Sequence, residues 1–206
     1  MTKNEFLLRF QLHHLSTSRS VIHSPKKLKP AAVLIPLIES PTQINNVNSD
    51  YNDERSHENS LHLLLTKRAS HLKHHAGQVS FPGGKVEPSD RDIFDTAMRE
   101  TQEEIGISYD NITIIGQLQP QQTNSGFIVT PIIGFVSSKP PYMFDKNEVA
   151  EVFQVPLRHF LNTDNHFSST RHRHGQQYKV HFMPYQHYNI WGATAAILKD
   201  LVLHLN

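Results

Sequence analysis

Three glutamates, Glu100, Glu103 and Glu104, lie within five residues of one another, a short distance after the Gly83-Gly84 pair. On a helix, positions i, i+3 and i+4 share a face, so these side chains would project into one patch. Like charges at this spacing repel one another unless a cation lies among them. Hard divalent ions such as Mg²⁺ and Mn²⁺ prefer carboxylate oxygens as ligands. The spacing therefore predicts a metal site on a short helix.

The residues around the glutamates favour such a helix. Ser89 or Asp90 can cap its start, and Gly106 can stop it after Ile105. The apolar residues of the segment form a separate stripe that can face a core. These residues are Ile93, Phe94, Ala97, Met98 and Ile105. Three helical glutamates alone are more often a solvated face than a metal site, so this pattern by itself does not decide between the two.

Composition limits the classes of protein that this chain can join. Its 206 residues fit one domain, and its net charge of +1 gives no field for nucleic acid or a membrane surface. Cysteine is absent, which excludes disulfides, thiolate metal sites and cysteine nucleophiles. The sequence has neither an apolar run of about 18 residues nor a signal-peptide core. We expect a cytoplasmic protein without nucleic-acid or membrane partners; its oligomeric state stays open, with a homodimer among the possibilities.

The first part of the chain predicts an extension followed by a hairpin. Residues 1–29 form an N-terminal extension with an amphipathic piece at Glu5–His13, and residues 30–206 form the main domain. Ala31–Ile38 is an apolar run of strand length, in which Pro36 suggests a sheet edge or a bulge. Leu61–Thr66 predicts a partner strand. The polar segment 39–60 between them predicts a long mobile loop.

The second part of the chain predicts more strands and two further helices. Trp191 and Phe81 are expected in the core, and the Arg171–His174 cluster in a solvated loop. Strands mixed with two substantial helices favour an α/β or α+β fold. The predicted strands are Ile112–Leu118, Phe127–Val136, Val149–Pro156 and Tyr178–Met183, and the helices are Leu157–Leu161 and Trp191–Leu205.

The run Arg99–Ile107, RETQEEIGI, resembles the second half of the Nudix box, the signature of hydrolases that cut nucleoside diphosphates linked to another group. Thr101 replaces the usual aliphatic residue, Asp90 replaces the usual glutamate, and one extra residue precedes Arg99. The resemblance implies a Nudix fold, in which a mixed sheet lies between helices in a single domain.

The segment Leu65–Gly84, LTKRASHLKHHAGQVSFPGG, resembles the additional signature of the coenzyme A pyrophosphatase branch of that family. This branch also has the lengthened box with aspartate. Lys73 stands where the branch has arginine, which keeps the charge but loses a bidentate fork. Further matches to this branch lie at Gly126–Phe135 (GFIVTPIIGF), at Glu148–Leu157 (EVxxVFxVPL-like) and at Ile190–Leu198 (IWGATAAIL). The resemblance therefore spans about residues 31–205.

The resemblance implies roles for the box residues. Glu100 and Glu104 are expected to bind Mg²⁺ or Mn²⁺ directly, with Glu103 as a third or water-mediated ligand. A backbone carbonyl of Gly84, or of Gly83, would complete the site. Arg99 is expected to pair with Glu103 at i+4 and to orient it.

The general base and the substrate contacts are less closely defined. The base could be a box glutamate such as Glu103, or Glu148 or Glu151 in a later loop, of which Glu148 is preferred. Arg68 and Lys73 are expected to meet the substrate phosphates, with His74 or His75 as further candidates.

The expected reaction converts a coenzyme A-like nucleotide into 4′-phosphopantetheine and adenosine 3′,5′-bisphosphate. Two alternatives remain at this level. One is a Nudix hydrolase of another substrate, such as a dinucleotide or a nucleotide sugar. The other is a Nudix-fold binding module without catalysis, although such modules usually lose box glutamates and this chain keeps all three.

Overall fold

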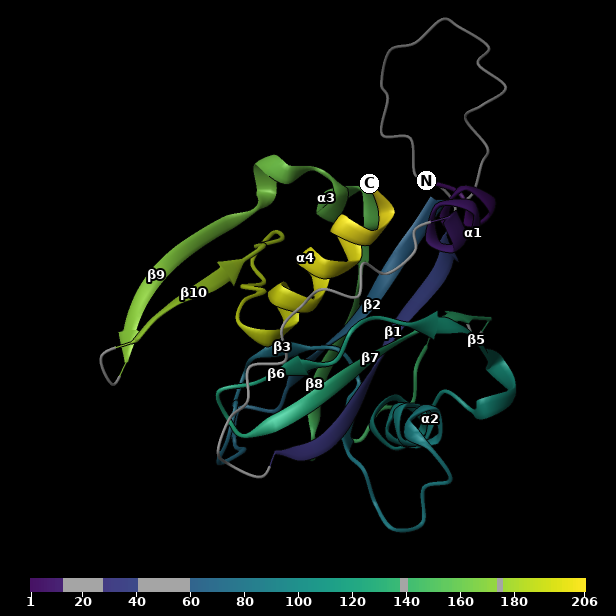
Figure 1. Cartoon of the computed structure of the whole chain (residues 1–206). Coiled ribbons are helices and arrows are strands. Elements are labelled where there is room, and N and C mark those ends of the chain that lie inside the picture. Colours follow the sequence, from purple (N-terminus) through teal and green to yellow (C-terminus); the bar gives the residue numbers. More distant parts are fainter. Residues whose placement is uncertain (13–27, 41–59, 138–140, 174–175) are drawn as a thin grey trace, which may run out of the picture.

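Strand β1 (Lys29–Ser40) lies inside the main sheet and pairs with three other strands (Figure 1). The figure shows a computed structural model that describes residues 1–12, 28–40, 60–137, 141–173 and 176–206. β1 runs parallel to β7 (Phe127–Val136) and antiparallel to β2 (Ser60–Arg68) and β4 (Gly83–Lys85). The predicted hairpin between the first two long strands is therefore confirmed. Residues 41–59 of the predicted mobile loop lie outside the described residues.

The main sheet is mixed and has eight strands within the described residues. Its principal order is β3-β2-β1-β7-β5, while β4 pairs with β1, β6 with β7, and β8 with β2. The remaining strands of this sheet are β3 (Val79–Ser80), β5 (Ile112–Gln117), β6 (Gln121–Gln122) and β8 (Val149–Pro156).

Pro36 occupies the interior of the sheet, so the prediction of an edge position was wrong. The N–H of Leu34 donates to the carbonyl of Pro82, and alternate residues of a strand direct their N–H groups to the same side. The nitrogen of Pro36 therefore faces that side as well. On that side of β1, Pro36 lies between the residues paired with β4, which end at Val33, and the residues paired with β2, which begin at Leu37. The proline therefore removes no hydrogen bond between strands, although it has no N–H group.

Helices cover both faces of the sheet, which confirms the predicted sandwich (Figure 1). Ala32 and Leu34 of β1 face a core that includes α2 (Ile93–Ile105). Ile35 and Leu37 face the opposite core, where α4 (Ala193–Leu205) lies with α1 (Lys3–Leu12) and α3 (Leu157–Leu161). Burial on both sides explains why β1 reads as a continuous apolar run. None of the described helices is long and apolar enough to cross a membrane.

The limits of α2 differ from the prediction at one end only. Asp92, rather than Ser89 or Asp90, is the N-cap, and its carboxylate accepts a hydrogen bond of 2.8 Å from the N–H of Asp95. The predicted C-terminal end is confirmed, because Gly106 adopts φ 72° and its N–H bonds to the carbonyl of Gln102. Asp90 lies outside the helix and has another partner, described below.

A two-stranded ribbon extends beside the main sheet (Figure 1). It consists of β9 (Phe167–Arg173) and β10 (Gln176–Phe182). The predicted loop at Arg171–His174 was therefore wrong for Arg171–Arg173, which belong to a strand, but Arg171 and His172 are exposed as predicted. His174 lies outside the described residues. Most side chains of β9 are polar and exposed, so its sequence lacks the alternation of apolar and polar residues by which strands are predicted. The strand forms through its backbone pairing with β10.

Two 3₁₀ turns, Tyr109–Asn111 and Thr163–Asn165, complete the described elements.

The N-terminal helix belongs to the core. Phe6 is completely buried, and its ring lies 5.9 Å from that of Phe10 and 6.0 Å from that of Phe135. The carbonyl of Met1 also accepts a hydrogen bond from the N–H of Leu61. The helix therefore closes one end of the core between α4 and the sheet.

We expect Phe6→Ala to lower the free energy of unfolding by about 3–5 kcal/mol, because it leaves a cavity where a buried ring has been. The matched control is Leu8→Ala in the same helix, where the side chain is 60% exposed and the expected loss is about 0.5 kcal/mol. Urea denaturation measures both. Equal losses in the two variants would contradict the assignment of α1 to the core.

Candidate active site

Arg99 connects the acidic side chains of the site. Its Nη1 donates to Glu100 Oε1 and to Glu103 Oε2, both at 3.0 Å. Its Nε and Nη2 donate to the two carboxylate oxygens of Asp90 at 2.7 and 3.1 Å, and Nη2 also reaches the carbonyl of Lys85. The expected ion pair between Arg99 and Glu103 is therefore present, within a wider network. One guanidinium orients three carboxylates at once.

Asp90, which replaces the usual glutamate of the box, has a structural role. Thr96 Oγ1 and the N–H of Glu87 both donate to its carboxylate, at 2.7 and 2.8 Å. The hydrogen bonds from Arg99 hold the pKa of Asp90 well below its usual range. Aspartate thus forms a bidentate pair with Arg99 from the loop before α2. Thr101, another departure from the usual box, is buried, and its hydroxyl donates to the carbonyl of Ala97 at 2.6 Å.

Gly84 lies directly against the carboxylate of Glu100. A Cβ atom at this position would come within 2.4 Å of Glu100 Cδ, so a larger residue here would displace the Glu100 carboxylate from its present position. The neighbouring Gly83 adopts φ +154°, and a Cβ there would lie 2.3 Å from the carbonyl oxygen of Ala32. Burial raises the pKa of Glu100, and the charges of Glu103 and Glu148 add to the rise, against the lowering by Arg99.

Glu104 is the most deeply buried carboxylate of the group, with 3% of the residue exposed. Its Oε1 lies 3.7 Å from Nη1 of Arg68, and its Oε2 has no hydrogen-bond partner. Burial, together with the smaller effect of the charges of Glu100 and Glu148, raises the pKa of Glu104 to about 8 against the attraction of Arg68. A buried carboxylate oxygen without a partner is costly unless a cation satisfies it.

The residues present fit a divalent cation by their chemistry. Glu100 and Glu104 are oxygen donors whose charged forms are disfavoured by burial and by mutual repulsion, and Gly84 brings the backbone beside them. Within the described parts of the chain, no group of three or more histidine, aspartate or glutamate side chains is arranged as it stands to hold a metal ion. Arg99 and Arg68 contact the carboxylates instead.

The two candidate bases in the later loop lie in different surroundings. Glu148 is exposed in the turn before β8, where its carbonyl accepts a hydrogen bond of 2.8 Å from the N–H of Ala69. Its charge contributes to the raised pKa values of Glu100 and Glu104. Glu151, in contrast, accepts a hydrogen bond from the hydroxyl of Tyr188. Of these two candidates, Glu148 is the one whose charge acts on the box and whose carboxylate has no hydrogen bond to another described residue.

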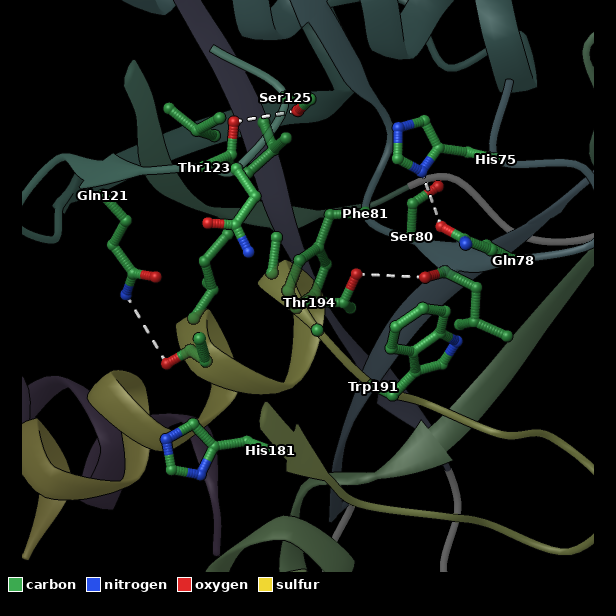
Figure 2. Close-up of a pocket in the computed structure, with 18 of the residues that line it drawn as sticks. His75, Gln78, Ser80, Phe81, Gln121, Thr123, Ser125, His181, Trp191 and Thr194 are labelled. Carbon is green, nitrogen blue, oxygen red and sulfur yellow. Dashed lines mark hydrogen bonds between the residues drawn. The ribbon is translucent and has the colours of Figure 1, made fainter. Parts of the chain in front are cut away.

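Figure 2 shows a cleft, about 600 Å³ in volume, that no side chain of α2 lines. Arg68 and Gly83 lie in its wall, so one predicted substrate residue lines the cleft. Lys73 is exposed in the following loop and does not line it, whereas His75 does. The other walls come from the loop 121–125, the strand β10 and the start of α4.

Trp191 also lines this cleft, so the prediction of a core position was wrong for it. The residue is 38% exposed, while Phe81, the other predicted core aromatic, is only 3% exposed. The predicted C-terminal helix begins at Ala193 rather than at Trp191. Trp191 and residues 121–125 were not assigned to the cleft from the sequence. No local sequence pattern distinguishes an exposed tryptophan from a buried one.

The site thus combines a helix that presents three glutamates, an arginine that pairs with two of them, and a second arginine that lines a cleft. The chain belongs to the Nudix family, because the NUDIX domain model matches residues 51–177. Members of this family are pyrophosphatases that act on phosphorus-containing anhydrides and generally need divalent metal ions. The chain is thus a Nudix hydrolase of a nucleoside diphosphate derivative.

Relatives of known sequence cover almost the whole chain. A protein of Cronobacter sakazakii, described as an uncharacterized Nudix hydrolase NudL, is 38% identical over 100% of this chain and 95% of its own length. A protein of the same description from Yersinia pestis is 37% identical over 96% of this chain and 92% of its own. A crystal structure of the Nudix hydrolase RenU from M. smegmatis covers 63% of this chain and 71% of that one, with 18% identity and a TM-score of 0.48.

We expect Glu104 to make the metal-free protein less stable as the pH rises. The pKa is about 8 in the folded chain and near 4.5 in the unfolded chain. Between these values the folded chain holds a proton that the unfolded chain has released, so the free energy of unfolding falls with increasing pH. The melting temperature of chelator-treated protein should therefore fall from about pH 5 to about pH 8.

The matched variant is Glu104→Gln, which removes the titrating group and should flatten this fall. Thermal unfolding at several pH values measures both proteins. Parallel curves for the parent and the variant would show that Glu104 ionises normally in the fold.

Proposed function

We propose that this chain hydrolyses the diphosphate of coenzyme A and its derivatives, giving 4′-phosphopantetheine and adenosine 3′,5′-bisphosphate. The observation that carries the proposal is the position of Arg68. This residue belongs to the Leu65–Gly84 segment that resembles the coenzyme A branch, yet it faces Glu104 of the box at 3.7 Å and lines the cleft. The segment that suggests the substrate and the helix that supplies the chemistry thus contribute to one site.

The proposal assigns the acidic side chains to one divalent cation site. Glu100, Glu104 and the carbonyl of Gly84 would hold Mg²⁺ or Mn²⁺, with Glu103 as a further ligand, directly or through water. Such a bound ion neutralises the charge of the diphosphate and lowers the pKa of a bound water. Arg99 acts as a positioning residue, because its hydrogen bonds fix the orientation of Glu100 and Glu103.

The proposal assigns proton transfer to Glu148. Its carboxylate accepts a proton from the attacking water while the water oxygen forms a bond to phosphorus. The anhydride P–O bond then breaks, and the second phosphate leaves with the electron pair of that bond. Arg68 lies where its guanidinium can neutralise a diphosphate oxygen, and Lys73 remains a prediction for a more distant phosphate. Glu103 is the alternative base within the box.

We expect Glu148→Gln to lower kcat by about 10²- to 10⁴-fold, because a glutamine cannot accept the proton. Glu151→Gln is the matched control, since Glu151 already accepts a hydrogen bond from Tyr188 and should change kcat by less than about 10-fold. Steady-state kinetics measure both variants. A larger loss for Glu151→Gln would move the base to that residue, and a loss confined to Glu103→Gln would move it into the box.

The substrate is tested by incubating the protein and Mg²⁺ or Mn²⁺ with coenzyme A, NADH and ADP-ribose. We expect release of 4′-phosphopantetheine from coenzyme A to have the highest kcat/KM. Glu104→Gln serves as the control and should lose several orders of magnitude in rate with every substrate, because it removes a ligand charge.

Two outcomes of this assay favour the alternatives. Cleavage of NADH or ADP-ribose without cleavage of coenzyme A would show a Nudix hydrolase of another substrate. A parent protein that is no faster than Glu104→Gln would show a binding module. A cytoplasmic location and the absence of nucleic-acid and membrane partners also remain predictions, and the oligomeric state stays open.

A further inference from the structure

Trp191 is the only tryptophan in the sequence, and it lies in the wall of the cleft (Figure 2). The residue precedes α4 and leaves 38% of its surface exposed. Figure 2 shows its indole beside Thr194, whose hydroxyl donates to the carbonyl of Val79 at 3.0 Å. A large aromatic surface therefore faces the same cleft as Arg68 of the candidate active site.

The backbone around Trp191 is fixed on both sides. Trp191 forms a β-bridge with Phe182 at the end of β10, and the N–H of Gly192 donates to the carbonyl of His181 at 3.0 Å. The two rings of Phe182 and Trp191 are nearly parallel, with 14° between their planes and 6.3 Å between their centroids. The indole is thus held in place before any ligand arrives, which reduces the entropy lost on binding.

Basic and polar groups surround this aromatic wall. Lys179 and His181 of β10 line the same cleft, and Lys179 is exposed. Arg68 and Gly83 also line the cleft. One cleft therefore contains Arg68, which lies 3.7 Å from Glu104 of the box, and a flat apolar surface with a second cation in the same lining. This combination suits a ligand with a diphosphate at one end and a planar base with an additional phosphate at the other.

We propose that Trp191 is the platform on which the adenine base of the substrate stacks, with Lys179 beside the phosphate of the ribose. The inference deepens the proposed function and rests on it for the identity of the nucleotide. Stacking on an aromatic ring strengthens binding by about 10- to 100-fold and tolerates different bases. The exposed Lys179 contributes less, because solvent screens a surface charge. Trp191 therefore increases the affinity for a purine nucleotide but does little to discriminate one purine base from another.

The single tryptophan gives a direct measurement. We expect adenosine 3′,5′-bisphosphate to quench the tryptophan fluorescence of the parent protein, excited where adenine does not absorb. 4′-Phosphopantetheine, which carries a phosphate but no base, should leave the fluorescence unchanged. Both titrations are made with Mg²⁺ and again with a chelator. Absence of quenching by the bisphosphate in both conditions would overturn the proposal.

Calorimetric titration with adenosine 3′,5′-bisphosphate then compares variants. Trp191→Leu should bind about 10- to 100-fold more weakly, whereas Trp191→Phe keeps a stacking surface and should stay within a few-fold of the parent. Phe167→Leu is the control, because Phe167 is a 55% exposed aromatic that does not line the cleft. Parent-like binding by Trp191→Leu, or a larger loss in Tyr178→Leu on the same cleft, would overturn the proposal. Thermal unfolding checks that each variant is folded.

The two proposals fail in different ways. If the bisphosphate quenches the fluorescence and coenzyme A is not cleaved, the platform stands and the substrate is another purine nucleotide. If coenzyme A is cleaved while Trp191→Leu binds the bisphosphate as the parent does, the platform is wrong and the proposed function stands.

Discussion

The hydrogen-bond network of Arg99 is the interaction on which the rest of the site depends. Acidic side chains on one helical face destabilise a fold unless their charges are matched. Arg99 binds Asp90 through two nitrogens and reaches Glu100 and Glu103 through a third. The loop before α2, the helix and β4 are thereby joined by one guanidinium. The site is in this way assembled before any substrate enters it.

Glu104 combines deep burial with an oxygen that has no hydrogen-bond partner among the described residues. A carboxylate with a raised pKa and an oxygen without a partner is a poor structural residue and a suitable ligand for a hard ion. Arg68 stands opposite and offers partial compensation at 3.7 Å. The same arginine faces the cleft, so it can compensate Glu104 and meet an anionic substrate from one position. The proposed function thus makes one carboxylate, that of Glu104, responsible both for stability without metal and for activity with metal.

Most strands of the sheet and the C-terminal end of the acidic helix at Gly106 could be predicted. Apolar runs of strand length and a glycine that ends a helix are both local signals in the sequence. Pro36 misled the prediction, since a proline in a central strand is tolerated only where two partner strands leave a gap, and that gap depends on register. The strand β9 was missed because it is polar and forms by pairing with β10. Trp191 was assigned to the core because tryptophans are usually buried, whereas the ribbon and α4 leave it at a cleft.

The sequence by itself determined the chemistry of the box. Glu100, Glu103, Glu104 and Arg99 are brought together by helical spacing, which acts over four residues. Only the tertiary structure decided what surrounds them. Arg68, Glu148 and Trp191 are separated by tens of residues along the chain, so their positions depend on the pairing of β2 with β8 and on where α4 begins. Such contacts arise when two cores form on the two faces of one sheet, and no local pattern encodes them.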